Sequence, residues 1–592
     1  MPVCRYRDAI GMLMTGDYPI KGASTCTRGL MMLKNLALSG CCFLFLLADT
    51  SWAEKPARPN IVLIMSDDMG YSDIGCYGGE IQTPNLDQLA ADGLRYTQFY
   101  NTARCCPTRA CLLTGLYPHQ TGVGYMMQDR GFDGYRGDLN RNCVTIAEVL
   151  REAGYNTYMA GKWHVSKITR PRNDGDKYNW PAQRGFDRFY GTIHGAGSFW
   201  DPSTLCRGNK MISAFADEEY QPTDPYYYTD AISNQAARFI HENPPTEPFF
   251  LYVAYTAAHW PLHARERDIA HYKGKYDEGY QAVREARLKK MKRLGVVKKD
   301  VKLSKAAGAW DSIEHKDWEA ANMEVYAAMV DAMDQGIGEI VKALKETGQY
   351  DNTFLCYLQD NGGCAEAAGR SLKANPRADK PTLPPLADDA LHYSGSTPKQ
   401  TRDGWPVRNG RVMPGPADTY IGYGKNWANV SNTPFREYKH WTHEGGISTP
   451  LIVHWPNGFK DKNRIRNQLC HLIDLMPTCV ELAGATYPDT FQGQPIKPME
   501  GKSLVPTLTN QPLERGPVFW EHEGNRAVRE GRWKLVAKRG RGGLPLDWEL
   551  YDIDEDRSES KNLIYDHSFM AAKMVRAWND YAKRTGVFPS PW

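Results

Sequence analysis

Short apolar runs alternate with longer amphipathic stretches over most of the chain. Five runs have the length and composition of fully buried strands, at residues 61–65, 155–160, 249–255, 354–358 and 451–453. Stretches with apolar residues at helical spacing lie between them, as at residues 230–242 and 323–345. Alternation of this kind predicts an α/β fold, with a large mostly parallel central sheet covered by helices on both faces.

Helix-end signals support this interpretation. Thr83 is a capping residue, and Pro84 after it suits the first turn of a helix. Thr145 and Glu148 form a capping box for a helix that ends at Gly154. Two helices are therefore expected to begin directly after the two threonines.

The C-terminal region has a different pattern. Four short runs read as strands and a helical pattern follows them, at residues 518–521, 527–529, 533–537, 548–551 and 568–583. This predicts a small C-terminal α+β subdomain, an antiparallel sheet plus a helix, over residues 515–592. The larger domain is expected to span residues 54–514, in which residues 373–435 are rich in Pro, Gly and Asn and predict long loops.

Composition limits the classes of partner. The chain is 42% hydrophobic and 24% charged with a net charge of +3, which predicts a globular protein without a strong field for nucleic acid or membranes. Of fourteen cysteines, ten lie beyond residue 53, and an exported chain could pair some of them. Their irregular spacing, with no CxxC repeat, argues against a zinc site.

The first 53 residues read as a signal peptide region. Lys34 precedes an apolar stretch at residues 36–48, and Ser51-Trp52-Ala53 places small residues at the −3 and −1 positions of a cleavage site. The apolar stretch is too short to span a membrane by itself. We therefore expect export, to the periplasm or outside the cell, without stable membrane insertion.

Acidic and amide side chains follow two of the predicted strands. Asp67 and Asp68 come after the first run, and Asp360 and Asn361 after the fourth. Because ligands bind at the carboxyl ends of parallel strands, we expect these side chains to meet at one edge of the sheet. Oxygen-only ligation suits Ca²⁺ or Mg²⁺ rather than zinc. Either pair alone could be an ordinary turn, and their combination favours a metal site.

Basic residues follow the other runs. Lys162 and His164 come after the second run, His259 after the third and His454 after the fifth. The same argument about strand ends places them near the acids. A lone histidine is more often structural, so these positions assign no role by themselves.

The most specific segment is Cys105-Cys106-Pro107-Thr108-Arg109, with Leu-Thr-Gly shortly after it. Pro107 suits the first turn of a helix, which places Cys105 just before that helix. Free backbone N–H groups there favour an anion and lower a thiol pKa. Arg109 could hold an oxyanion or brace the loop. On this argument alone, a structural cysteine and a reactive one are equally supported.

The same segment resembles the signature of the sulfatase family, Cys-x-Pro-x-Arg…Leu-Thr-Gly. The resemblance extends over about residues 57–565 and is nearest the arylsulfatase-type branch of this alkaline phosphatase-like superfamily; it includes the C-terminal pattern Glu549-Leu550-Tyr551-Asp552. It implies that Cys105 is oxidised to formylglycine (3-oxoalanine) before folding, by a formylglycine-generating enzyme.

The resemblance also implies one calcium ion. Its ligands would be residue 105 and the two acidic pairs, Asp67, Asp68, Asp360 and Asn361. Lys439 matches the lysine that precedes Glu-Gly-Gly in the family, although Ser448 stands where an arginine is often found. His440 and His443, in the same segment, are not expected to be catalytic.

The implied reaction is hydrolysis of sulfate monoesters, either aryl sulfates or sulfated carbohydrates, to an alcohol and inorganic sulfate. A formylglycine hydrate would attack sulfur, while calcium, Lys162 and Lys439 meet the charge on the sulfate oxygens. His259 would protonate the leaving oxygen, and His164 would take a proton from the second hydroxyl. Arg109 and Lys162 would stabilise the aldehyde hydrate.

The substrate and two rival functions stay open. Trp163 and Trp260 could stack on a sugar or aryl ring, or pack in the core. Ten Lys and Arg within residues 281–305 could steer a sulfated polysaccharide, or form an ordinary solvated helix face. The rivals are a phosphonate monoester or phosphodiester hydrolase of the same superfamily, and an exported binding protein with unconverted Cys105.

Overall fold

The computed structural model describes residues 58–393, 397–540 and 547–592. They belong to one compact unit, Pro56–Trp592. The expected signal peptide, residues 1–53, lies outside the described residues, so export stays a prediction. Within the described residues, no helix combines the length and the apolar character that crossing a bilayer requires.

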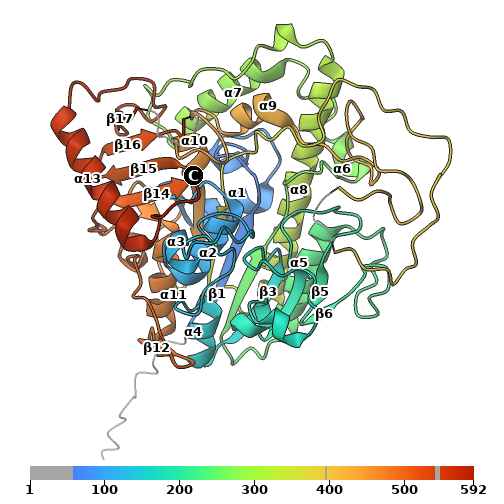
Figure 1. Ribbon diagram of the computed structural model, residues 1–592, viewed down its shortest axis with the longest axis horizontal. Coiled ribbons are helices and arrows are strands. Elements are labelled where there is room, and N and C mark those ends of the chain that lie inside the picture. Colours follow the sequence, from blue (N-terminus) through green and yellow to red (C-terminus); the bar gives the residue numbers. More distant parts are fainter. Residues whose placement is uncertain (1–57, 394–396, 541–546) are drawn as a thin grey trace, which may run out of the picture. The chain divides into compact units, whose positions relative to one another are not determined.

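The centre of the fold is an eleven-stranded sheet (Figure 1). Its middle is parallel and consists, in this order, of β8 (Thr353–Gln359), β1 (Asn60–Ser66), β7 (Phe249–Ala254), β3 (Asn156–Gly161) and β4 (Arg188–Thr192). Antiparallel pairs extend it through β9 (Ser448–His454) to β2 (Leu94–Tyr100) on one side, and through β5 (Leu205–Arg207) to β6 (Lys210–Met211) on the other. Two short strands, β10 (Arg464–Arg466) and β11 (Cys470–His471), pair parallel with β2. The predicted large, mostly parallel sheet is confirmed.

Strand β9 runs against its neighbour β8, which the apolar pattern did not predict. Leu355 of β8 lies opposite His454, and Leu358 lies opposite Leu451. His454 therefore lies at the edge of the sheet opposite to the polar ends of β1 and β8, with Nε2 3.1 Å from the Tyr350 hydroxyl. The expectation that His454 joins the acids is wrong, because an apolar run does not indicate the direction of its strand.

Helices cover both faces of the sheet. Side chains of β1 alternate between the two: Val62 and Ile64 belong to one apolar cluster, and Leu63 and Met65 to the other. The first face packs against α1 (Pro84–Ala91), α5 (Tyr228–Glu242), α7 (Gly279–Leu294), α8 (Lys316–Glu346) and α9 (Gly424–Ser431). The second packs against α2 (Cys105–Thr114), α4 (Ile146–Glu152) and α11 (Leu475–Ala483); the same apolar cluster continues to α13 (Ser568–Thr585), which packs on the small C-terminal sheet.

The two predicted caps have different outcomes. The Thr145 hydroxyl accepts a hydrogen bond from Glu148 N at 3.0 Å, and Glu148 Oε2 accepts one from Thr145 N at 2.7 Å, which confirms the capping box of α4. Thr83 precedes α1 but does not cap it. Its hydroxyl instead accepts a hydrogen bond from Gly75 N at 2.8 Å, and this bond ties the preceding turn to the start of the helix.

The C-terminal region forms the expected small antiparallel sheet with a helix. Its strands, in order, are β14 (Val518–His522), β15 (Asn525–Glu530), β16 (Trp533–Ala537) and β17 (Glu549–Asp552), and α13 packs on β15 and β16. The described residues between β8 and α9 contain no helix or strand of their own, as the loop prediction for residues 373–435 requires. Helix α9 itself, inside that range, was missed. The boundary at residue 515 stays a prediction.

Candidate active site and metal centre

Two acidic pairs meet at the carboxyl edge of the sheet. Strand β1 leads into Asp67 and Asp68, and the neighbouring parallel strand β8 leads into Asp360 and Asn361. Asp68 N donates to Asp360 Oδ1 at 3.2 Å, and Asn361 Nδ2 donates to Asp68 Oδ1 at 2.7 Å. Asp68 has a φ of 56°, a left-handed conformation that aspartate tolerates better than most residues. All four side chains are buried.

The oxygen atoms of this cluster fit a hard divalent cation. Asp67 Oδ1 and Asn361 Oδ1 are buried and have no hydrogen-bond partner. A buried acceptor left unpaired costs about 1–3 kcal/mol, so two of them at one place indicate a missing positive partner. Carboxylate and amide oxygens are the ligands that Ca²⁺ and Mg²⁺ take in proteins. The residues present therefore fit the calcium ion that the sequence predicts.

Cys105 opens helix α2 beside this cluster. The helix begins at Cys105, with Arg104 as its N-cap, so the predicted position just before the helix is wrong by one residue. The reason is that Pro107, as the third residue, still lies in the first turn, where no N–H is needed. A hydrogen bond from Cys106, together with the charge of Lys162, holds the pKa of the buried Cys105 thiol well below its usual range.

A buried charge network links helix α2 to the acids. Arg109 Nη2 lies 3.0 Å from Asp360 Oδ2 and 3.5 Å from Asp67 Oδ2. Arg109 Nη1 donates to the Lys162 carbonyl oxygen at 3.1 Å, and the Lys162 ammonium forms an ion pair with Asp67. These four side chains are fully buried, so little water screens their charges and each one affects the protonation of the others.

The two carboxylates of this network differ in acidity. Burial raises the pKa of Asp67, but attraction to Lys162, His259 and Arg109 outweighs burial and lowers the pKa to about 2. Burial and the negative charge of Asp67 raise the pKa of Asp360 well above its usual value. Without a metal, Asp67 is therefore ionised while Asp360 holds a proton more readily, and cation binding at this site should depend on pH.

Two histidines approach the cluster from the ends of β3 and β7. His164 packs against Gly195, where an added Cβ would lie 2.0 Å from the ring. Burial lowers the pKa of His164 to about 3, so the ring is neutral at neutral pH. His259 Nε2 lies 3.4 Å from Asp68 Oδ2, and its Nδ1 donates to the Trp260 carbonyl oxygen at 2.6 Å. One ring thus lies beside the thiol and the other beside the acids.

Lys439 reaches the site because β9 is reversed. It precedes the short helix α10 (Glu444–Ile447) and β9, whose first residues lie at the edge that carries the acids. Lys439 Nζ lies 2.8 Å and 2.9 Å from the two carboxylate oxygens of Asp68, and both side chains are 1% exposed. Burial lowers the pKa of Lys439, but the negative charge of Asp68 raises it by more, so the pKa lies well above its usual value. The ammonium is therefore charged.

An arginine from the C-terminal region supports this segment. Ser448 Oγ accepts a hydrogen bond from Arg557 Nη2 at 2.8 Å, and Arg557 Nε lies 3.2 Å from Glu444 Oε2. Arg557 thus brings a guanidinium to Ser448, the position at which the sequence resemblance led us to expect an arginine. Sequence reasoning missed Arg557, because it is separated from Ser448 by 109 residues and lies in no motif.

The structure separates the two tryptophans. Trp163 is fully buried and its Nε1 donates to the Asn179 carbonyl oxygen at 2.8 Å, so it packs in the core. Trp260 is partly exposed, with its ring centroid 4.7 Å from that of His259, and its Nε1 donates to Glu366 at 2.9 Å. Of the two, Trp260 alone is placed to meet a substrate.

Two further expectations change with the structure. Part of the basic run at residues 281–305 faces inward: Arg287 lies 2.7 Å from both Asp73 and Glu80, and Arg284 is buried. Helix α7 is therefore not a free basic surface along its whole length. All ten cysteines in the described residues are buried and free of disulfides.

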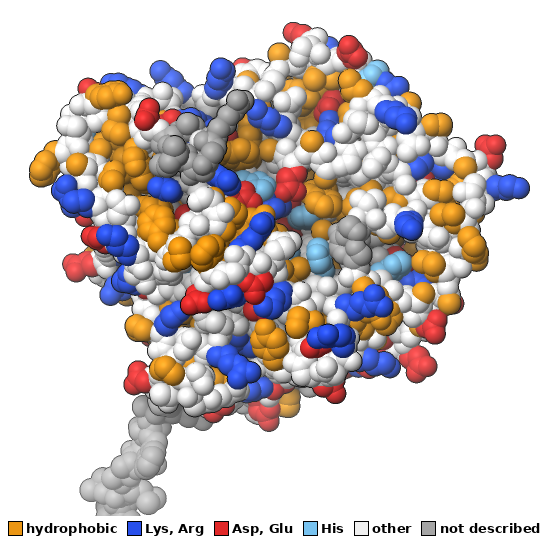
Figure 2. Space-filling model, viewed as in Figure 1, with side chains coloured by type: hydrophobic (Ala, Val, Ile, Leu, Met, Phe, Trp, Pro, Cys, Tyr) orange, Lys and Arg blue, Asp and Glu red, His pale blue; other side chains and the backbone are white. Residues whose placement is uncertain are grey.

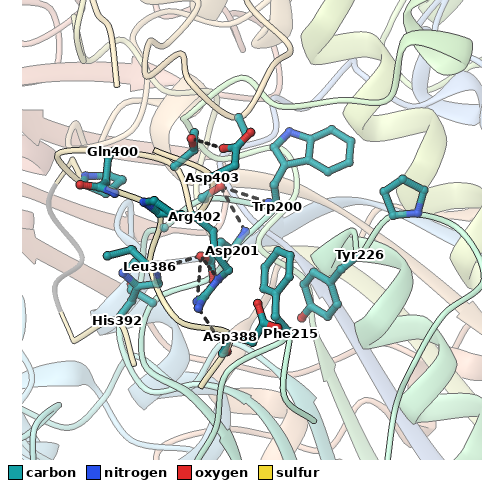
Figure 3. Close-up of a pocket in the computed structure, with 18 of the residues that line it drawn as sticks. Trp200, Asp201, Phe215, Tyr226, Leu386, Asp388, His392, Gln400, Arg402 and Asp403 are labelled. Carbon is teal, nitrogen blue, oxygen red and sulfur yellow. Dashed lines mark hydrogen bonds and ion pairs between the residues drawn. The ribbon is translucent and has the colours of Figure 1, made fainter. Parts of the chain in front are cut away.

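A cavity of about 590 Å³ lies between residues 197–226 and 385–420 (Figure 3). Aromatic rings form much of its wall, those of Trp200, Phe215, Tyr226 and Tyr420. At one side the Asp201 carboxylate is held by Arg402 at 3.0 Å and by His392 at 2.8 Å. Size and lining are those of a pocket for a small organic group.

Two contacts connect the cavity to the site. The ring of Tyr420 lies 6.0 Å from that of Trp260, which is the neighbour of His259. On the other wall, the chain runs from His194, whose ring is 5.8 Å from that of His164, to Gly197 in the lining. In Figure 2, histidine side chains gather around a hollow near the middle of the face shown.

Known proteins resemble the chain over most of its length. It matches the sulfatase family over residues 59–485, and the C-terminal domain of N-sulphoglucosamine sulphohydrolase over residues 436–580. It is 32% identical over 562 residues to an uncharacterised sulfatase of Schizosaccharomyces pombe, covering 90% of this chain and 95% of that one. It is 33% identical over 470 residues to the arylsulfatase of Klebsiella aerogenes, covering 78% and 94%.

Solved structures share the fold at lower identity. Ps i-CgsB in complex with k-i-k-neocarrahexaose superposes with a TM-score of 0.60 at 24% identity, covering 90% of this chain and 94% of that one. The phosphonate monoester hydrolase of Agrobacterium radiobacter gives a TM-score of 0.52 at 18% identity, covering 89% and 96%. These likenesses concern the fold alone, whereas the family match spans the acids, the thiol, both histidines and Lys439. The chain belongs to the sulfatase family, and it is a sulfuric ester hydrolase.

Proposed function

We propose that this sulfatase cleaves sulfate monoesters with a formylglycine made from Cys105 and with a calcium ion. The observation that carries the proposal is the burial of the Cys105 thiol in the same charge network as Asp67, Asp360 and Lys162. The ion would be held by the oxygen cluster already described, Asp67, Asp68, Asp360 and Asn361. The two unpaired buried oxygens of that cluster support a cation there.

Formylglycine and calcium would each make a defined chemical contribution. As its hydrate, formylglycine supplies one hydroxyl that attacks sulfur and a second hydroxyl whose deprotonation expels sulfate. Calcium supplies positive charge for the sulfate oxygens. Lys162 and Lys439 bring two buried ammonium groups to the same cluster and favour a bound sulfate group. Arg109 holds Asp360 and Asp67 in place from helix α2.

Proton transfer falls to the two histidines. His164 lies beside residue 105 and is neutral at neutral pH, the state in which a base takes up a proton. His259 lies beside Asp68 at the opposite side of the cluster and is the donor for the leaving oxygen. A positioned acid or base of this kind contributes about 10²–10⁴-fold to the rate.

The alcohol part of the substrate is proposed to enter the cavity of Figure 3. Aromatic rings stack on both aryl groups and sugar faces, and the cavity is connected to the site through Tyr420 and Trp260. Replacing Phe215 by alanine should then lower kcat/KM for a bulky aryl sulfate, with little change for a small alkyl sulfate. Equal losses of kcat/KM on both substrates would show that the cavity does not bind the alcohol part of the substrate.

The nucleophile and the reaction class are tested together. In protein made with the maturing enzyme, the peptide containing residue 105 should be about 18 Da lighter than its thiol form. The same preparation should hydrolyse an aryl sulfate faster than the matching aryl phosphate or phosphonate ester. A fully active preparation whose residue 105 has the thiol mass would overturn the nucleophile. Faster cleavage of the phosphonate would favour the phosphonate hydrolase, and no hydrolysis by converted protein would favour a binding protein.

Export is a separate proposal, and it rests on the charged, apolar and small residues of residues 34–53. Protein recovered outside the cytoplasm should begin at Glu54 when its N-terminus is sequenced. Full-length protein retained in the cytoplasm of the natural host would contradict it.

A further inference from the structure

Glu366 lies beside the site, on the segment that follows β8, and its two carboxylate oxygens have different partners. Oε2 accepts a hydrogen bond from Trp260 Nε1 at 2.9 Å, and Oε1 lies 3.1 Å from Arg104 Nη1. Trp260 directly follows His259, and Arg104 is the N-cap of α2, whose first residue is Cys105. One carboxylate therefore joins two segments that carry groups of the site.

The surroundings of Glu366 keep its carboxyl group ionised. Burial raises the pKa of this group, but the charge of Lys439, a hydrogen bond from His440 and the charge of Arg104 outweigh burial, and the pKa lies far below its usual range. A hydrogen bond to an ionised group is roughly twice as strong as one between neutral groups. Trp260 is therefore bound to a strong acceptor that is itself held in place.

The ring of His259 depends on the residue that follows it. His259 Nδ1 donates to the Trp260 carbonyl oxygen at 2.6 Å, and the two ring centroids are 4.7 Å apart. This bond leaves Nε2 as the nitrogen that faces the acids, 3.4 Å from Asp68 Oδ2. The bond made by one nitrogen of an imidazole sets the role of the other. A shift of Trp260 would therefore move Nε2 relative to the leaving oxygen.

Backbone bonds fix the chain on either side of Trp260. Two of them join Asp67 to residues 257–258, with N–O distances of 2.9 Å and 2.7 Å, and a third fixes Leu262 at 2.9 Å. Trp260 lies between these anchors and is partly exposed. An indole has a single N–H donor, and Glu366 accepts from it.

We propose that Glu366 is a positioning residue for the leaving-group acid: it holds Trp260, and Trp260 orients the ring of His259. The inference rests on the proposed function, in which His259 protonates the leaving oxygen. Glu366 acts through these two rings and need not touch the substrate. Sequence reasoning missed it, because a glutamate outside any helix, strand or motif gives no local signal.

A matched pair of substrates measures this role in protein whose residue 105 has been converted. Phenyl sulfate and para-nitrophenyl sulfate have the same ring, but the phenolate is the more basic leaving group and depends more on an acid. In Glu366→Ala, kcat/KM for phenyl sulfate should fall about 100-fold, the loss that a misplacement of about 1 Å can cause. For para-nitrophenyl sulfate the fall should be less than about 5-fold. A general loss of order would lower both values by the same factor.

A double variant shows whether the effect passes through His259. His259→Gln should cause the same selective loss on phenyl sulfate as Glu366→Ala. In the His259→Gln background, Glu366→Ala should have little further effect, because the ring that it orients can no longer donate a proton.

Two milder variants test the indole bond itself. Trp260→Phe keeps an aromatic ring but loses the N–H, so it should show the selective loss even if Glu366→Ala does not fold. Glu366→Gln keeps an acceptor for the indole and should lose less activity on phenyl sulfate than Glu366→Ala.

Glu523→Ala is the matched control. Glu523 is a second carboxylate that lies 3.0 Å from His440, and its side chain is 24% exposed against 26% for Glu366. Its replacement should leave the ratio of the two kcat/KM values unchanged, and thermal unfolding confirms that each variant is folded. A converted wild type that cleaves neither sulfate would overturn the proposed function, and this inference with it. With an active wild type, equal losses on both sulfates in Glu366→Ala, or a full further loss in the His259→Gln background, would overturn the positioning role alone.

Discussion

Replacement of Lys439 by methionine tests the electrostatics of the site most directly. Its ammonium lies 2.8 Å from Asp68, and both side chains are 1% exposed. At that separation and an effective dielectric constant of about 20, the attraction is about 6 kcal/mol. Desolvation offsets part of this, and loss of one partner of a buried pair costs about 3–5 kcal/mol. We expect Lys439→Met to lower the free energy of unfolding of calcium-free protein by that amount.

Calcium should reverse most of this loss. A bound cation replaces the ammonium as the partner of Asp68, so calcium should stabilise the variant more than the wild type. Lys534→Met is the matched control. Lys534 is equally buried and lies 3.0 Å from Glu444 and 2.8 Å from Glu559, in the C-terminal sheet. Its loss should be the same with and without calcium.

Scanning calorimetry in chelator and in calcium measures both effects. The unfolding entropy of a chain of this length is about 1 kcal/mol/K, so the expected loss corresponds to a fall in Tm of about 3–4 °C. A fall of less than about 1 °C in chelator would show that Asp68 is not compensated by Lys439. An equal fall in chelator and in calcium would show that no cation reaches Asp68.

Three further predictions concern single side chains. Cys105→Ser should accept one sulfuryl group and stall, because serine lacks the second hydroxyl, and intact-mass analysis should find the sulfated adduct; sustained turnover would contradict this. His164→Gln should lower kcat by about 10²–10⁴-fold. Because burial lowers the pKa of His164 to about 3, a wild-type kcat that falls with an apparent pKa near 6 would have to report another group. Burial lowers the pKa of His454 from 6.5 to about 4, so only the unfolded chain takes up this proton between those values and stability falls as pH falls, by up to about 1.4 kcal/mol per pH unit. His454→Gln should reduce that slope in urea unfolding between pH 6.5 and 4, and an unchanged slope would remove His454 as the cause.

The acid cluster could be predicted because its causes are local. Strands β1 and β8 each show an apolar run with acids directly after it, and parallel neighbours bring such ends together. Their side chains then meet whatever the rest of the chain does. The same reasoning placed Lys162, His164 and His259, which follow β3 and β7 in the same parallel block.

The remaining parts depend on packing that no local pattern records. The direction of β9 determines that Lys439 lies at the site and that His454 lies at the opposite edge of the sheet. The sequence could not show this, since an apolar run reads the same in both directions. Burial separated Trp163 from Trp260, although both flank a histidine of the site. Arg557 contacts Ser448 only because the C-terminal sheet packs against this edge. Pairings of this kind are fixed by tertiary structure, so a single sequence leaves them open.

The backward course of β9 makes completion of the catalytic centre a late step in synthesis. Every carboxylate of the cluster leaves the ribosome before Lys439, which is held in place only once β9 has entered between β8 and β2. Until then Asp68 lacks its ammonium partner, and an unpaired charge opposes closure of this edge. Cys105 is 1% exposed in the folded chain, so the proposed conversion to formylglycine would have to precede this last step of folding.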